Sequence, residues 1–181
     1  QRQMCIRDRP FMVLATQNPV ETYGTYHLPE AQMDRFLMKI SMGYPEKEEE
    51  LAILRRSADA APANLSAVIS LEEIVALKEK VEHIHISPRL EEYIVNLAEA
   101  TRDSEYIRLG VSPRGSLALH RTARAYAVLC GRDYVLPDDI KFLAPFVLTH
   151  RIIISPKGKS VLGSPEEVLA QLLRTLTVPT E

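Results

Sequence analysis

Apolar residues recur at intervals of three and four along the C-terminal half of the chain, which is the spacing of a helix face. Four such stripes can be traced: Leu90, Tyr93, Ile94, Leu97 and Ala98; Leu119, Ala123, Tyr126, Ala127 and Cys130; Ile140, Leu143, Ala144, Val147 and Leu148; Val168, Leu169, Leu172, Leu173 and Leu176. A Ser-Pro pair precedes three of them, supplying a capping hydroxyl and a proline suited to the first helical position. These pairs are Ser87-Pro88, Ser112-Pro113 and Ser164-Pro165. The pattern predicts an all-α helical bundle over residues 86–181.

Two further helices are indicated by charges and a cap upstream of the bundle. The acidic stretch 46–50 and the basic pair Arg55-Arg56 match the two ends of one helix macrodipole. Ser70 and Glu73 form a capping box at the start of the second helix. Between the helices, residues 57–70 are rich in small residues, which is typical of a linker. Residues 46–85 are therefore expected to be connecting helices and a linker.

Two short apolar runs before residue 45 have the composition of buried strands. Residues 11–15 end in Gln17-Asn18 and are stopped by Pro19, and residues 37–42 follow Asp34-Arg35-Phe36. In open α/β sheets the ligand lies beyond the carboxyl ends of the strands, so polar residues there face a site. We expect residues 10–45 to be the C-terminal part of an α/β core with two candidate strands. The chain as a whole is expected to be mainly α.

Composition excludes several classes of function. The 181 residues are 46% hydrophobic and 25% charged, which is ordinary for a globular protein. The formal net charge of -2 gives no basic surplus for nucleic acid, and no apolar run approaches the roughly 18 residues of a spanning helix, so membrane insertion is not expected. Two cysteines make no disulfide framework, which favours a cytoplasmic location, and Cys130 is expected to be a buried thiol. The five histidines show no metal-ligand spacing.

Three motifs carry a resemblance to a known family. The chain reads ATQNP at residues 15–19, continues to DRF at 34–36, and later contains GVSPR at 110–114. This sequence resembles the MoxR family of AAA+ ATPases, whose pattern is ATQNP, then EGTYPLPEAQLDRF, then GASPRA. The chain departs from that pattern at Tyr23, His27 and Met33. Gly115 replaces an alanine and is expected to loosen the helix start slightly. The resemblance continues through residues 131–140 and His150-Arg151, and so covers most of residues 10–179.

The nucleotide-holding motifs of such ATPases are missing from the sequence. No G-x-x-x-x-G-K-[ST] loop and no Walker B strand occurs, and in the family both lie upstream of the segment that begins at residue 10. We therefore expect a truncated ATPase: the end of a P-loop AAA+ core followed by the helical AAA lid. Residues 1–9 match neither the family nor a signal peptide and are expected to be a non-native leader.

The resemblance implies roles for three residues. Asn18 would be sensor 1, which orients the attacking water, and Arg35 would be the arginine finger delivered into a neighbouring subunit. Arg114 would be sensor 2, which contacts the γ-phosphate. ATP and Mg would then be the cofactors, with Asn18 and Arg114 in the nucleotide site and the Mg ligands outside this sequence.

Each of these residues also has a simpler interpretation. Asn18 could end a strand in an Asn-Pro turn, and Arg35 could pair with Glu30 on its own helix. Arg114 opens a helix without local acid, a place suited to an anion, unless Glu91 or Glu99 of a neighbouring helix pairs with it. The second Ser-Pro-Arg, at 87–89, has acids beside it and is not such a place.

The resemblance implies a hexameric ring that matures or remodels client proteins, often with a von Willebrand factor A-domain protein as partner. An alternative is a non-catalytic helical protein-binding module. A second alternative is a DNA-remodelling AAA+ protein, against which the net charge argues.

Overall fold

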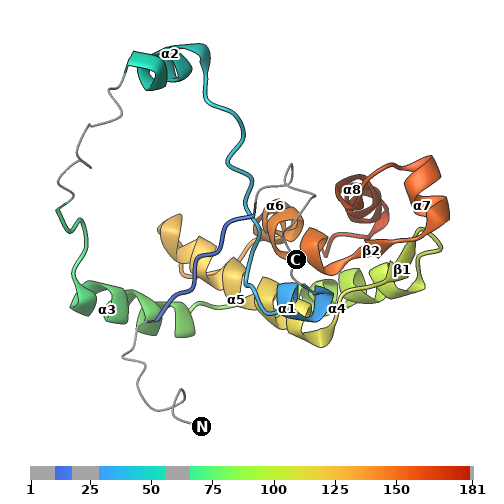
Figure 1. Cartoon of the computed structure of the whole chain (residues 1–181). Coiled ribbons are helices and arrows are strands. Elements are labelled where there is room, and N and C mark those ends of the chain that lie inside the picture. The colour runs from blue at the N-terminus through green and yellow to red at the C-terminus, as the bar shows by residue number, and fades with distance from the viewer. Residues whose placement is uncertain (1–10, 18–28, 56–65, 180–181) are drawn as a thin grey trace, which may run out of the picture.

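The computed structural model describes residues 11–17, 29–55 and 66–179 (Figure 1). The helices are α1 (Glu30–Met33), α2 (Lys47–Arg55), α3 (Leu71–Glu82), α4 (Pro88–Asp103), α5 (Pro113–Leu129), α6 (Pro137–Leu148), the 3-10 helix η2 (Thr149–Arg151), α7 (Pro156–Val161) and α8 (Pro165–Thr175). The strands are β1 (Ile107–Leu109) and β2 (Ile153–Ile154), which pair antiparallel. The prediction of a mainly helical chain ending in a helical bundle is confirmed.

Most of the predicted helix starts have the expected caps. The Ser70 hydroxyl accepts from the Glu73 amide at 3.1 Å, and the Glu73 carboxylate accepts from the Ser70 amide at 2.7 Å, which completes the capping box. Ser87 and Ser164 likewise accept from the amides of residues 90 and 167. These caps satisfy amides that have no partner inside their own helix.

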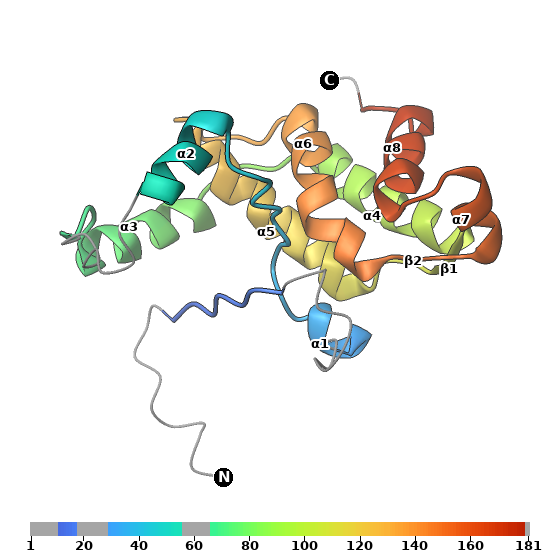
Figure 2. The same ribbon diagram turned by 45° about the horizontal axis from the view of Figure 1, so that its top comes forward.

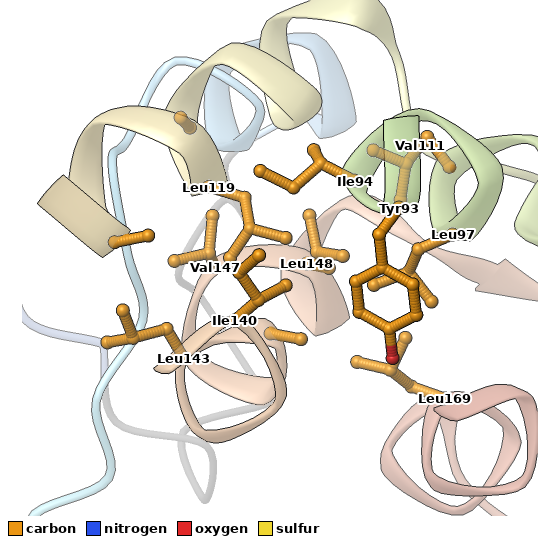
Figure 3. Close-up of a cluster of buried hydrophobic side chains, with 14 of the residues drawn as sticks. Tyr93, Ile94, Leu97, Val111, Leu119, Ile140, Leu143, Val147, Leu148 and Leu169 are labelled. Atoms are coloured by element: carbon orange, nitrogen blue, oxygen red, sulfur yellow. The ribbon is translucent and has the colours of Figure 1, made fainter. Parts of the chain in front are cut away.

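The core lies between α4, α5, α6 and α8 (Figure 3). Leu97, Leu119, Ile140, Leu148 and Leu169 are fully excluded from solvent. They belong to all four predicted stripes, so the helical periodicity identified the faces that pack together. Cys130 is the exception, because α5 ends at Leu129 and the chain turns away there; the thiol is exposed and the prediction of a buried one was wrong.

The two candidate strands are not strands in this structure. Residues 11–17 and 37–46 have no regular secondary structure, and Met12, Leu14 and Ile40 are exposed. A strand exists only where a neighbour accepts and donates its backbone hydrogen bonds. In the described ranges no strand lies beside either segment; the Lys39 amide instead donates to a carbonyl of α6 at 2.8 Å. The pair β1–β2, too short to give a sequence pattern, lies within the bundle.

The segment that follows α1 runs along the outside of the bundle to α2 (Figures 1 and 2). Helix α2 buries no residue, and Leu54 on its surface is 77% exposed. Helix α3 is joined to α5 through Arg124, which donates to the carbonyls of Glu82 and Ile84. The contacts of Arg124 in the described residues are thus with backbone carbonyls. In the described part of the chain, no helix combines the length and apolar composition needed to cross a membrane.

Candidate nucleotide-sensing site

The turn after α1 brings Asp34 against the bundle. Helix α1 is a single turn, and Arg35 and Phe36 continue it with backbone bonds to residues 32 and 33. Figure 2 shows α1 beside the end of the bundle where α5 begins, and α1 contacts η2. The turn therefore places residues 34–37 where α5 begins and α6 ends.

The Asp34 carboxylate contacts three side chains of the bundle. Arg151 Nε lies 3.1 Å from Oδ1, and the Ser112 hydroxyl donates to both oxygens at 3.2 Å. Arg114 Nε lies 4.0 Å from Oδ2. The Arg151 side chain is 2% exposed and that of Arg114 is 56% exposed. One carboxylate is thus shared by a buried and an exposed arginine.

Arg151 makes five hydrogen bonds, which equals the number of N–H donors that a guanidinium has. Besides the Asp34 carboxylate, its acceptors are the backbone carbonyls of Asp34, Phe36, Leu37 and Val147. Burial lowers the pKa of Arg151, and the Asp34 charge acts in the opposite direction. An arginine side chain with a complete set of acceptors and a carboxylate partner stays charged. Its burial is made tolerable by the complete set of partners.

The start of α5 obtains its negative charge from outside its own helix. Ser112 is the N-cap by position, but its hydroxyl bonds Asp34 and no helix amide, so the capping role expected for it was wrong. No acid lies in the first turn of α5. Asp34 therefore compensates both the positive helix end and the Arg114 guanidinium.

The acid beside Arg114 is not one of the two considered from the sequence. Glu91 contacts His120 at 3.3 Å, and no ion pair of Glu99 is found in the described residues. The partner is Asp34, whose carboxylate lies 80 positions earlier in the chain. A 4.0 Å pair with an arginine more than half exposed contributes only ~0–1 kcal/mol, so this contact is easily exchanged for another anion.

Arg35 is exposed and forms no ion pair with any residue of the described ranges. The pair with Glu30 considered from the sequence is therefore not present. Asn18 lies outside the described residues, so the structure brings together two of the three predicted site residues. Arg35 is the chain neighbour of Asp34, and Arg114 is its ion-pair partner.

Comparisons with known proteins indicate the family to which the chain belongs. The family model "AAA lid domain" matches residues 99–172, and "ATPase family associated with various cellular activities (AAA)" matches residues 1–38. The protein YeaC of Bacillus subtilis (strain 168) is 46% identical over 173 residues, which cover 95% of this chain and 54% of that protein. Chaperone MoxR1 of Mycobacterium tuberculosis is 38% identical over 179 residues, which cover 94% of this chain and 47% of that protein. The chain belongs to the MoxR family of AAA+ ATPases.

A solved structure supports the same assignment. A candidate ATPase from Cytophaga hutchinsonii superimposes with a TM-score of 0.83 at 39% identity, over 96% of this chain and 56% of that one. The chain spans about half the length of the curated relatives it matches. The AAA match includes residues 1–9, and the non-native leader expected there stays a prediction.

Gly115, where this MoxR-family chain departs from the expected alanine, lies under Arg151. A Cβ on Gly115 would lie 2.5 Å from Val111 Cγ1 and 3.0 Å from Arg151 Cδ. The missing methyl group thus makes room for the aliphatic part of the buried arginine. We expected this glycine only to loosen the helix start; the structure gives it a packing role.

Sequence reasoning missed Asp34 and Arg151, although both lie in motifs that it quoted. His150, which has no metal-ligand spacing in the sequence, is half-buried, with Nε2 3.3 Å from the Phe36 carbonyl and no partner for Nδ1 among the described residues. Burial, followed by the charge of Arg151, lowers the pKa of His150. The signal that could have found Arg151 is the His-Arg pair after an apolar helix, but nothing local shows what it binds. No cluster suited to a metal ion occurs among the described residues.

Proposed function

We propose that this chain is the sensor and lid half of an ATP hydrolase of the MoxR type. ATP would lie between core and lid at a subunit interface, with Mg²⁺ held by residues outside this sequence. The observation that supports this most is that Arg114, at the start of a helix without acid of its own, pairs with Asp34, the residue next to Arg35 in the chain. A positive helix end with an exposed arginine suits a phosphate.

Each proposed residue would act on a different part of the reaction. Arg114 would leave its weak pair with Asp34 and bind the γ-phosphate, where its planar fork can form two bonds. Arg35, exposed and without an ion pair in the described part, would enter the neighbouring subunit's site. Asn18 would orient the attacking water. In this proposal residues 10–45 belong to the core, 46–85 connect, and 86–181 form the lid.

We further propose that the intact protein acts as a chaperone-like machine. Hydrolysis would move the lid against the core and transmit force to a client protein. Support comes from the relative named Chaperone MoxR1. A homo-oligomeric ring, expected to be hexameric, is required by a finger that works across an interface. A von Willebrand factor A-domain protein remains the proposed partner.

The first test removes the proposed finger from the full-length protein. Arg35→Ala should abolish hydrolysis and spare ATP binding, because the finger acts on charge that develops in the transition state. Arginine fingers contribute roughly 10³- to 10⁵-fold in rate, or about 4–7 kcal/mol of barrier. Steady-state hydrolysis and equilibrium binding of a fluorescent ATP analogue measure the two effects separately.

Mixed rings test whether the finger acts in trans. A subunit with Arg35→Ala keeps its own pocket, and a subunit lacking its P-loop lysine keeps its finger, so mixing the two should restore part of the activity. If co-assembled rings show no rescue, Arg35 is not a trans-acting finger.

The second test concerns Arg114 and has a matched control in the same chain. Arg114→Ala should weaken nucleotide binding and slow turnover, because the lid arginine would touch the bound nucleotide. Arg89 occupies the same place in the other Ser-Pro-Arg motif, at the start of α4, where Glu91 supplies acid in the first turn. Arg89→Ala should leave both quantities unchanged. Equal effects of the two substitutions would contradict the sensor role.

A further inference from the structure

The Arg151 side chain is bonded to the backbone on both sides of Arg35. Its terminal nitrogens donate to the carbonyls of Asp34, Phe36 and Leu37. Its Nε donates to the Asp34 carboxylate at 3.1 Å. Four of its five bonds thus end on residues 34–37, and the fifth ends on Val147 in α6. The segment that carries Arg35 is held to the bundle chiefly by this one side chain.

The finger itself has no such support. Arg35 is exposed and has no ion pair in the described part of the chain, so no described side chain fixes the direction of its guanidinium. The turn backbone must therefore set where the guanidinium points. Arg151 is 2% exposed and uses all its donors, so the turn cannot shift without leaving buried N–H groups unpaired.

We infer that Arg151 is a positioning residue for Arg35: it fixes the turn 34–37 to the lid, so that the lid of one subunit aims the finger into its neighbour. This inference rests on the proposed trans-acting role of Arg35. Under this inference the ion pair between Asp34 and Arg151 affects the rate of hydrolysis, whereas a pair that only stabilises the fold would not. Asp34 shares in the role through its carboxylate, and Gly115 makes the room that Arg151 needs.

The informative substitution is Arg151→Lys in the full-length protein. Lysine keeps the charge and most of the aliphatic stem, but its donors sit on one nitrogen and cannot reach carbonyls on both sides of residue 35. A finger displaced by about 1 Å is expected to lose on the order of 10²-fold in rate. We therefore expect a 10- to 100-fold fall in turnover with nucleotide affinity unchanged.

Mixed rings can distinguish an effect of Arg151→Lys on the position of Arg35 from a general loss of function of the subunit that carries it. One subunit type carries Arg35→Ala and hydrolyses in its own pocket; the other lacks its P-loop lysine and donates the finger. Arg151→Lys in the finger donor should reduce the rescued rate 10- to 100-fold. The same substitution in the pocket subunit, which has no finger to aim, should leave the rescued rate within about twofold.

A second arginine provides the control for stability. Arg132 also forms a close ion pair in the lid, with Asp139 at 2.6 Å, but does not touch residues 34–37. Arg132→Lys should affect the rescued rate equally from either subunit type. If Arg151→Lys does not fold, Asp34→Asn is placed in the same two positions; it removes the ion pair and keeps the four carbonyl bonds.

The outcomes are distinct. Loss confined to the finger donor supports the inference, and equal loss from both positions overturns it by making Arg151 merely structural. An Arg151→Lys ring with wild-type turnover also overturns it. If mixed rings with wild-type Arg151 show no rescue, the proposed trans-acting role of Arg35 is contradicted, and the inference about Arg151 is not the cause.

Discussion

Two adjacent aspartates at the start of α6 should respond very differently to the same substitution. Asp139 accepts from both terminal nitrogens of Arg132, at 2.6 and 2.8 Å, and from the Leu136 amide at 2.8 Å. Asp138 is 87% exposed at its side chain and contacts only Lys141, at 3.3 Å. Both residues lie in the first helical turn, so both interact with the same macrodipole. The difference in stability between Asp139→Asn and Asp138→Asn therefore measures the contribution of the buried contacts of Asp139.

The contacts give the expected size of the difference. Removing one partner of a buried ion pair costs about 3–5 kcal/mol. The Arg132 side chain remains 20% exposed and keeps its bond to the Tyr134 carbonyl, so part of its charge stays solvated and paired. We therefore expect Asp139→Asn to lower the free energy of unfolding by about 2–4 kcal/mol. Asp138→Asn should cost at most about 1 kcal/mol, the sum expected from an exposed pair and the helix end.

Urea unfolding followed by far-ultraviolet circular dichroism measures both variants. With a denaturant slope of about 2 kcal/mol per molar, Asp139→Asn should move the midpoint down by about 1–2 M and Asp138→Asn by less than about 0.5 M. The slope itself should not change, because both variants unfold to the same exposed chain. Equal midpoints for the two variants would refute the claim that the buried 132–139 network stabilises the bundle more than the exposed 138–141 pair does.

Three other properties can be measured on the chain itself. Calorimetry should find MgATP binding weaker than about 1 mM, because one or two exposed ion pairs supply ~0–1 kcal/mol each whereas 10 μM affinity needs about 7. Limited proteolysis should leave residues 84–179, which hold the buried core, and digest residues 29–55 first; survival of the N-terminal part alone would contradict this. The free energy of unfolding should fall as the pH drops below about 6.5, by up to about 1.4 kcal/mol per unit, because the unfolded chain protonates His150 while burial keeps it neutral in the folded state. His150→Gln should flatten that dependence; an unchanged slope would exclude His150 as its source.

The bundle could be predicted because its signals are local. Ser70 caps the amide three residues away, and each apolar stripe is read within one helix. The strands could not, because a strand depends on partners elsewhere in the chain. Residues 37–42 have the composition of a strand, yet among the described residues their backbone binds one carbonyl of α6 and the Arg151 side chain, with no neighbouring strand. Composition alone therefore predicted a strand that could form only beside other strands of a sheet.

In the site, too, residues within short motifs could be identified from the sequence, whereas contacts between distant residues could not. Arg35 and Arg114 were each chosen from a motif whose own residues are consecutive in the sequence, DRF at 34–36 and GVSPR at 110–114. The pair 34–151 joins residues 117 positions apart, and no spacing rule predicts it. Gly115 looked like a small loss of helix propensity, because its neighbour Arg151 is supplied by η2 and not by its own helix.

The two Ser-Pro-Arg helix starts show that the local sequence can predict a missing negative charge but cannot identify the residue that supplies it. At α4 the cap and the acid are both local: Ser87 accepts from the Leu90 amide, and Glu91 lies in the first turn. At α5 neither is local, and the missing negative charge predicts an anion from elsewhere. In this structure that anion is Asp34, so under the proposed function a γ-phosphate at Arg114 would compete with it. Because Arg151 would still neutralise Asp34, the exchange would leave no unpaired buried charge, and the turn that carries the proposed finger could stay in place while the proposed sensor changes partner.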